Sequence, residues 1–385
     1  MPPEEHMKIL VDFTSVTGGG GGEQSVALLD ALSSLSGQSN IEFVCAFRSD
    51  GPLATVLRER GFETVEIANS MLRRAYFSLV QAKRLIRRLG IDVVYVAFGV
   101  GLNVPRSCPQ IINVAYPIIC YPESPYWRFL PPIRRLKTFL KSRARAWLIR
   151  SRATRVIVES QTMKSRLARH AGFDSERMIV VPPIVGRVAT IATKLAFDNR
   201  VRLSQSRGQL RILFISGADF HKNLWRLLEV AEHLHNSNKH DVKFALTVPE
   251  GSFLRSCSAA GVLHRVPFRR DFFDFLGPKF GSELAAELML AGVVANISDL
   301  ESISNNFIEA FCANKPMLLA RRDFSLAAVR VPYVACEPHS VESFVTAIIR
   351  CQRGEFESPN SSEQLAISGV DRARQVLSVI EATLC

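Results

Sequence analysis

Two adjoining stretches near the N-terminus decide the fold: KILVDF at residues 8–13, and GGGGGEQSVALLDAL at residues 18–32. The first is an apolar run of strand length, and the second joins five glycines to a segment with helical apolar spacing. Ordering glycine costs backbone entropy, so a run of glycines needs a local reason. One reason is a tight turn whose amides approach an anionic ligand at a helix N-terminus, and the alternative is a flexible loop.

The same alternation of strand-like and helical segments continues along the chain in two sets. Strands are expected at 9–13, 41–47, 65–67, 92–97, 110–115, 155–158 and 178–181, and again at 210–216, 242–248, 272–276, 292–297, 316–320 and 333–335. Strands that alternate with helices predict parallel sheets built from βαβ units. The fold class is therefore α/β with two Rossmann-like domains, which bind ligands beyond the carboxyl ends of their strands.

Domain boundaries follow from the same pattern. We expect a first domain at residues 1–185, a polar linker at 186–209 and a second domain at 210–360. The remaining residues, 361–385, are predicted to be helical and could cross back to the first domain.

Composition narrows the function classes. No apolar run reaches the roughly 18 residues that span a bilayer, and the polar start Met1–His6 lacks the apolar region of a signal peptide. We therefore expect a cytoplasmic protein. The eight cysteines and eight histidines show no spacing typical of metal ligands, so neither a metal nor a cofactor is expected.

The net charge of +12 is unevenly distributed. Residues 128–169 hold thirteen Lys or Arg residues against one acid, Glu159, which indicates an anionic partner. Within a helix expected at 131–152, an apolar stripe either packs on the sheet or forms a patch for the membrane surface together with the arginines. Nucleic acid is the competing partner, but no nucleic-acid-binding motif is present.

The residues that could carry chemistry follow strands of the second domain. Lys222 lies in the turn after strand 210–216, where a lysine beside a helix start can meet a phosphate. The stretch DLESISNNFIEAF at 299–311 places Glu301 and Glu309 eight residues apart around a polar turn. Either Ser304 or Asn305 simply caps a helix, or the two carboxylates bind sugar hydroxyls.

This spacing resembles the Glu-x7-Glu motif of retaining glycosyltransferases of family 4, enzymes of bacterial polysaccharide and lipopolysaccharide synthesis with the GT-B fold. Other landmarks follow in the family's order along nearly the whole chain: RVIVESQTMK at 155–164, IVVPP at 179–183, HKN at 221–223, FLG at 275–277 and KP at 315–316. The resemblance implies two Rossmann-like domains whose sheets face a central cleft.

It also implies roles for particular residues. Glu301 would lie near the donor sugar, Glu309 on the ribose, and Lys222 on the diphosphate, so Glu301 and Lys222 are the catalytic candidates. The further donor-binding candidates are Gly20, Gly21, Gly217, Pro249, Phe275, Leu276, Ser304, Asn305 and Asn306.

The chain departs from the family at two places. Ala218 stands where many relatives carry an arginine, and the segment Asn113–Pro117 lacks their histidine, so Asn113 and Tyr116 become the acceptor candidates. The expected function is metal-independent, retaining transfer of a sugar from a UDP- or GDP-sugar to a glycan or lipid-linked acceptor, at the inner face of the cytoplasmic membrane. The alternative is a non-catalytic GT-B homologue that acts as a scaffold for a glycan or a partner.

Overall fold

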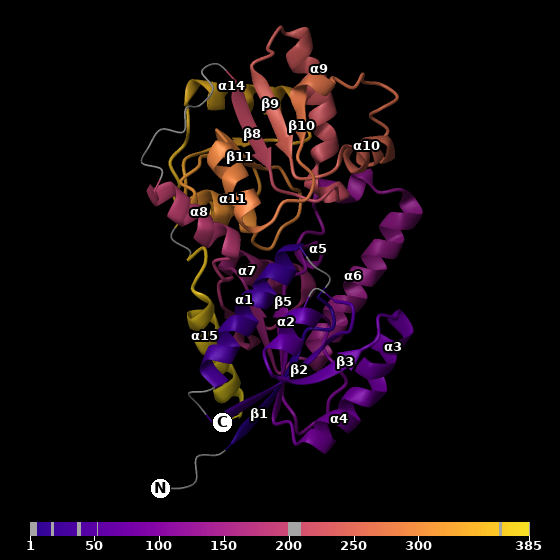
Figure 1. Ribbon diagram of the computed structural model, residues 1–385. Coiled ribbons are helices and arrows are strands. Elements are labelled where there is room, and N and C mark those ends of the chain that lie inside the picture. The colour runs from indigo at the N-terminus through magenta and orange to yellow at the C-terminus, as the bar shows by residue number, and fades with distance from the viewer. Residues whose placement is uncertain are drawn as a thin grey trace. The chain divides into compact units, whose positions relative to one another are not determined.

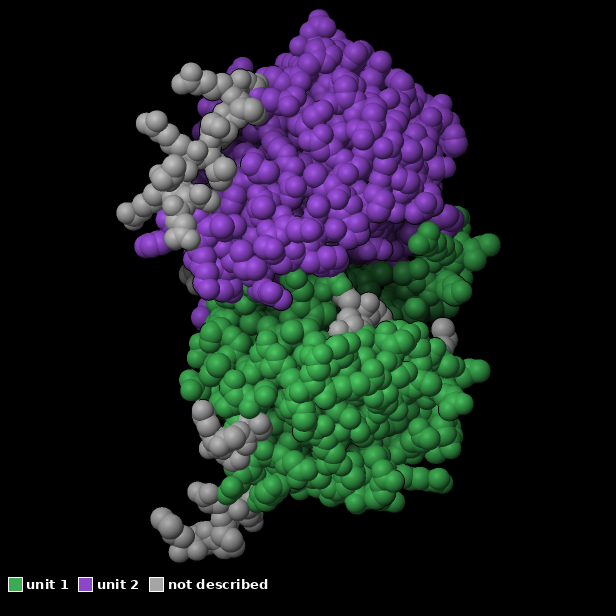
Figure 2. Space-filling model, viewed as in Figure 1, with its two compact units in different colours: residues 1–122, 132–186, 366–385 green, residues 123–131, 187–365 purple. Residues whose placement is uncertain are grey.

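The computed structural model describes residues 6–16, 19–36, 40–51, 53–198, 209–361 and 364–384. Within them the chain forms two compact units, coloured separately in Figure 2. Unit 1 comprises residues 1–122, 132–186 and 366–385, and unit 2 comprises residues 123–131 and 187–365. No described helix is both long and apolar enough to cross a membrane.

Unit 1 is built on a seven-stranded parallel sheet in the order β3-β2-β1-β4-β5-β6-β7. The strands are β1 (Met7–Asp12), β2 (Ile41–Arg48), β3 (Glu63–Ile67), β4 (Val93–Val96), β5 (Gln110–Val114), β6 (Arg155–Val158) and β7 (Met178–Val180). The central strands β4 and β5 are buried along their whole length, as expected for strands covered by helices on both faces.

The helices of unit 1 follow the strands in the expected alternation (Figure 1). They are α1 (Gly19–Ser36), α2 (Ala54–Glu59), α3 (Met71–Tyr76), the π-helical turn η1 (Phe77–Gln81), α4 (Ala82–Leu89), α5 (Pro117–Cys120), α6 (Pro132–Arg152), α7 (Gln161–Ala171), η3 (Ser175–Arg177) and α15 (Gly369–Leu384). The described glycines after β1 form the first turn of α1, so this helix begins within the glycine run and not after it. Gly18 lies outside the described residues.

Unit 2 has a six-stranded parallel sheet in the order β10-β9-β8-β11-β12-β13. Its strands are β8 (Leu210–Phe214), β9 (Val242–Leu246), β10 (Phe273–Phe275), β11 (Val293–Asn296), β12 (Met317–Ala320) and β13 (Tyr333–Cys336). Its helices are η2 (Pro125–Phe129), α8 (Arg187–Asp198), η4 (Phe220–Lys222), η5 (Leu224–Arg226), α9 (Leu227–Asn236), α10 (Glu250–Ala259), η6 (Arg270–Phe272), α11 (Gly281–Leu290), α12 (Asn305–Cys312), α13 (Asp323–Ala328) and α14 (Val341–Arg353). The prediction of two Rossmann-like parallel sheets is confirmed.

The expected linker at 186–209 is corrected by the structure. Its first half is helix α8, which belongs to unit 2 and packs against α11 and α12. Val188, Ala189 and Ala192 are buried in that contact. Seven of the twelve residues of α8 are apolar, so the prediction of a polar linker was wrong for this half of the segment. Residues 199–208 lie outside the described part of the chain.

Two other boundaries also differ from the expectation. Residues 123–131 belong to unit 2 although they lie within the predicted first domain, because Phe129 packs on Trp225 and His339 with ring centroids 5.5 Å and 4.7 Å apart. The last helix, α15, begins at Gly369 rather than at residue 361 and belongs to unit 1, where it lies beside α1 (Figure 1).

The residues just before α15 are extended because they pair with unit 1. Ile367 forms a parallel bridge with Ile184, and Val185 donates its backbone N–H to the carbonyl of Ile367 at 2.9 Å. Arg372 on α15 is buried and donates to the backbone carbonyls of Val181 and Pro182. The return of the C-terminal helix to the first unit is thus held by both backbone pairing and a buried arginine.

Candidate functional site

Lys222 and Glu301 meet at the carboxyl edge of the sheet of unit 2. Lys222 ends the short helix η4 after β8, and Glu301 lies in the loop after β11. The Nζ of Lys222 lies 2.5 Å from Oε1 of Glu301, and both side chains are largely shielded from solvent. Strands β8 and β11 are neighbours at the point where the strand order reverses, which is where open α/β sheets bind ligands.

The ion pair keeps Glu301 charged in a buried position. Burial by itself raises the pKa of the Glu301 carboxyl, but the charge and the hydrogen bond of Lys222 do most to outweigh burial and hold the pKa below its usual value. The pKa of His221 is lowered, first by burial and then by Lys222. The site therefore presents one carboxylate and one ammonium side by side at neutral pH.

Backbone hydrogen bonds join the two loops that carry this pair. The N–H of Asp299 donates to the carbonyl of His221 at 2.9 Å, and the side-chain amide of Asn223 donates to the carbonyl of Ile297 at 2.9 Å. Asn223 adopts a left-handed conformation with φ of 57°, a conformation that asparagine tolerates better than most residues. Lys222 and Glu301 are thus held in place by the chain around them.

A second network fixes the start of the Glu301 loop. The carboxylate of Asp299 is almost fully buried, 2.8 Å from Nε2 of His339 and 3.0 Å from a guanidinium nitrogen of Arg322. Burial raises the pKa of Asp299, but His339 and Arg322 together hold it below its ordinary value. Sequence reasoning missed this network because His339 lies 40 residues from Asp299 and no local pattern connects them.

The loop after Glu301 leads into helix α12, with Ser304 at the N-cap position. Ser304 makes no side-chain capping bond, so its interpretation as a purely structural capping residue does not hold. The other capping candidate, Asn305, is the first residue of the helix. Asn306 and Glu309 are buried in the first turns. The opening amides of a helix lack helical acceptors and can bind an anion.

A small cavity lies between these elements. It has a volume of about 10 Å³ and is lined by residues that include Ser216, Lys222, Asn296 and Asn306. A volume of this size holds about one water molecule. The side-chain NH₂ of Asn296 is buried and has no hydrogen-bond partner among the described residues, so a polar group in this cavity would satisfy it.

The remaining candidates of unit 2 also follow strand ends at this edge. Gly217 follows β8, Pro249 precedes α10 after β9, and Phe275 ends β10 with Leu276 directly behind it. The N–H of Leu276 donates to the carbonyl of Leu246 at 2.9 Å. The ring of Phe275 is partly buried, with the guanidinium of Arg270 5.0 Å from its centroid.

In unit 1, Gly20 and Gly21 lie in the first turn of α1, after β1. Gly20 is exposed, and a side chain at Gly21 would meet the Phe98 ring at 3.6 Å, an ordinary contact distance. Strands β1 and β4 are neighbours where the order of this sheet reverses. The glycines therefore lie at the reversal point of unit 1, as Lys222 and Glu301 do in unit 2.

The structure gives Asn113 a structural role in place of the expected acceptor contact. Its side chain is only 2% exposed; its amide donates to the carbonyl of Ala97 at 3.0 Å, and its oxygen accepts from Arg372 at 3.2 Å. The oxygen therefore contributes to the docking of α15, and the amide bonds the chain just after β4. Tyr116 is partly exposed beneath Arg145, whose guanidinium lies 4.8 Å from the ring centroid, and remains an acceptor candidate.

Comparison with known proteins adds an independent line of evidence. Residues 19–186 match the model of Glycosyltransferase Family 4. This part of the chain is similar to that family. The match covers less than half of the chain and agrees with the resemblance that the sequence motifs indicate. No curated protein sequence matches.

Solved structures share the fold of this chain at low sequence identity. Anabaena Alr3699/HepE in complex with UDP-glucose aligns with a TM-score of 0.63 and 16% identity over 97% of this chain and 95% of that chain. WaaG, a glycosyltransferase involved in lipopolysaccharide biosynthesis, aligns with a TM-score of 0.60 and 16% identity over 97% of this chain and 98% of that chain. Sucrose-phosphate synthase from Thermosynechococcus elongatus aligns with a TM-score of 0.60 and 14% identity over 98% of this chain and 96% of that chain.

Proposed function

We propose that the protein transfers a sugar from a nucleotide-diphosphate donor to a glycan or lipid-linked acceptor, with retention of configuration and without a metal ion. The observation that carries the proposal is the Lys222–Glu301 pair at the reversal point of the unit 2 sheet. A buried lysine beside a carboxylate offers a cation for the diphosphate and hydrogen-bond acceptors for sugar hydroxyls in one place.

In this mechanism the side chains stabilise charge, and the departing diphosphate oxygen takes the proton that the acceptor hydroxyl loses as it bonds to the sugar. As the bond to the donor sugar breaks, negative charge grows on the departing diphosphate. Lys222 and the amides at the start of α12 would bind that charge, and fixed donors of this kind usually contribute the largest catalytic effect. Glu301 would orient the donor sugar and Glu309 the ribose.

The identity of the donor is best approached through UDP-sugars. The Anabaena structure contains UDP-glucose, so we propose UDP-glucose as the first donor to test. Phe275 ends β10 and Leu276 follows it; both would flank the base, with Arg270 near Phe275.

We further propose that the acceptor lies at an anionic membrane surface, which unit 1 contacts through α6. The apolar stripe of α6 does not pack on the sheet: Ile133 is 85% exposed, Leu136 61%, Leu140 57% and Trp147 60%. Six cations accompany the stripe on the same helix: Arg134, Arg135, Lys137, Lys141, Arg143 and Arg145. Large apolar side chains exposed together mark an interaction surface, and each cation adds about 1 kcal/mol near anionic lipid.

Another part of unit 1 has the same character. Leu72 on α3 is 82% exposed, and it lines a groove of about 750 Å³ with Tyr76, Arg73, Arg84 and Arg88. Arginines beside exposed apolar side chains suit a phospholipid, whose headgroup is anionic and whose chains are apolar.

Two measurements test the proposal. Thermal unfolding with UDP, GDP, ADP and CMP should reveal one nucleotide that raises the melting temperature, because a ligand at 100 times its Kd adds about 2.7 kcal/mol of stability. Transfer from the corresponding labelled sugar should then be lost in Lys222→Ala and Glu301→Ala. If no nucleotide stabilises the protein, or if both variants transfer sugar at the normal rate, the proposed donor site is wrong. That result would favour the alternative of a non-catalytic scaffold.

A further inference from the structure

A cluster of three potential metal ligands lies at the opposite edge of the unit 2 sheet from Lys222. His235 is in the last turn of α9, His240 precedes β9 by two residues, and Asp271 precedes β10 by two residues. Since β9 and β10 are parallel neighbours, His240 and Asp271 both lie at the amino ends of their strands. Lys222 and Glu301 follow carboxyl ends, so the cluster is separate from the proposed donor site.

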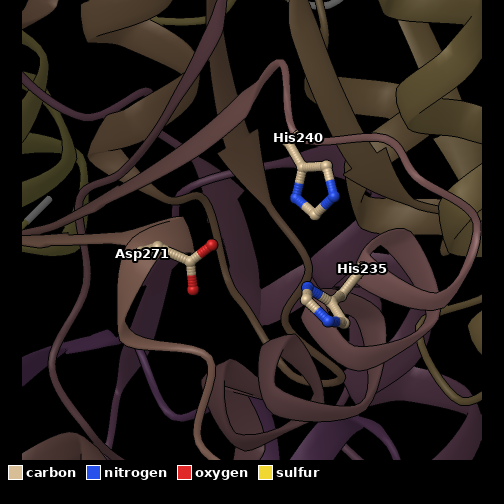
Figure 3. A group of neighbouring side chains, drawn as sticks. All are labelled: His235, His240 and Asp271. Atoms are coloured by element: carbon tan, nitrogen blue, oxygen red, sulfur yellow. The ribbon is translucent and has the colours of Figure 1, made fainter.

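The three side chains converge (Figure 3). One potential ligand atom from each lies within 4.8 Å of the others. The two imidazole rings have centroids 5.2 Å apart and planes at 81°. In a tetrahedral zinc site with bonds of about 2.0–2.2 Å, ligand atoms are roughly 3.4 Å apart. Small side-chain rotations therefore bring the three groups onto one ion.

The backbone around the cluster is already fixed. The N–H of Lys239 donates to the carbonyl of Leu234 at 2.9 Å, and Asn238 adopts a left-handed φ of 54°, which turns the chain back toward α9. The ring of His240 packs 5.8 Å from that of buried Phe272, and Lys243 donates to the carbonyl of Asp271 at 2.6 Å. A metal ion would need little backbone rearrangement.

The charges around the cluster leave its ligands available. Arg269, close to Asp271 in sequence, is held by Glu232 at 2.6 Å, and the ammonium of Lys243 lies 3.8 Å from Asp274. Within the described residues the Asp271 carboxylate makes no ion pair, and the buried Nδ1 of His235 has no hydrogen-bond partner. No existing bond therefore commits His235 to one tautomer.

We propose that His235, His240 and Asp271 bind one divalent transition-metal ion of the zinc type. Two imidazoles and a carboxylate suit Zn²⁺, Co²⁺ or Ni²⁺, whereas Mg²⁺ and Ca²⁺ prefer oxygen ligands alone. His240 and Asp271 are exposed, which leaves a fourth position open to water. The ion would tie the end of α9 to the starts of β9 and β10 and stabilise unit 2 without taking part in transfer.

The test is a titration of the untagged full-length protein with Co²⁺ and Zn²⁺ after chelator treatment. The proposal predicts one saturable site per chain, visible absorption from bound Co²⁺ that Zn²⁺ abolishes, and a melting temperature raised by Zn²⁺. His240→Ala and Asp271→Asn should each weaken binding about tenfold or more. Both residues are exposed, so the metal-free variants should melt as the wild type does.

His233→Ala is the matched control, because His233 is an exposed histidine of the same helix outside the cluster. It should bind Co²⁺ with unchanged affinity. Absence of saturable binding, or equal binding by His240→Ala and the wild type, overturns the proposal. The nucleotide thermal shift, measured without metal, reports separately on the donor site.

Discussion

The ion pair between Lys222 and Glu301 predicts opposite effects of two substitutions on nucleotide binding. Each removes one charge of a contact that is 2.5 Å long. Lys222→Met removes the cation that would bind the diphosphate. Glu301→Gln removes the carboxylate that competes with the diphosphate for the same ammonium. The first should weaken binding of the nucleoside diphosphate, and the second should strengthen it.

The magnitude follows from the contact. A hydrogen bond to a charged group contributes about 1.5–3 kcal/mol, and each 1.4 kcal/mol is tenfold in Kd. Lys222→Met should therefore raise the Kd of the nucleoside diphosphate about 10- to 100-fold. Glu301→Gln should lower that Kd by roughly threefold to tenfold, yet sugar transfer should fall because the carboxylate near the donor sugar is gone.

Isothermal titration with UDP, or with whichever nucleotide stabilises the protein, measures both effects. Lys239→Met is the control, because this lysine of the same unit lies between α9 and β9, away from the carboxyl edge of the sheet. Unchanged affinity in Lys222→Met, or equal weakening in both variants, would refute the reasoning.

Three further predictions concern the membrane surface, the C-terminal helix and the Asp299 network. Replacing both Leu136 and Leu140 with serine should lower binding to anionic vesicles roughly tenfold per residue, and the melting temperature should not change. Vesicle flotation measures the binding, and unchanged flotation would count against the membrane proposal. Arg372→Ala should destabilise unit 1 by about 3 kcal/mol, because buried carbonyls and Asn113 lose a charged donor. Thermal unfolding measures this loss, and an unchanged melting temperature would disprove the anchoring role of Arg372. Because the folded-state pKa of Asp299 lies below its usual 3.8, the ionised carboxylate stabilises the fold above about pH 4, and this contribution is lost as the pH falls. Asp299→Asn should therefore be less stable than the wild type at pH 7, with the gap closing below pH 4 in urea unfolding; a gap independent of pH would contradict this account.

The sequence predicted the fold because the strands carry strong local signals. Runs such as residues 93–96 and 110–114 are buried throughout and could hardly be anything but central strands. Helix α8 was predicted as part of a polar linker, although most of its residues are apolar and Val188, Ala189 and Ala192 recur at helical spacing. That spacing was the available signal.

Other features depend on contacts that no local pattern can reveal. The amphipathic character of α6 was evident, but only the structure decides whether its apolar stripe is covered, and Leu136 and Trp147 are exposed. Likewise, Phe129 packs on residues more than ninety positions away, and Asn113 accepts a hydrogen bond from Arg372, which is 259 positions away in the sequence. Asn113 was predicted to be an acceptor residue, and its burial could not be deduced from residue type.

The clustering of candidate donor residues rested on topology more than on local sequence. Lys222 and Glu301 are 79 positions apart, and they meet because β8 and β11 are neighbours in the sheet. The Rossmann strand order, once inferred, was sufficient to place both residues at one edge. The proposed metal-ligand cluster could not be found in this way, because His235 and His240 have no familiar spacing and Asp271 follows 31 residues after His240.

A crystal structure of the protein with its nucleotide-sugar tests the central claim most directly. Our account predicts the diphosphate within hydrogen-bond distance of the Lys222 ammonium and of backbone amides at residues 304–306, with a ribose hydroxyl on Glu309. A nucleotide bound elsewhere, with the Lys222–Glu301 pair intact and solvent beside it, would contradict the account.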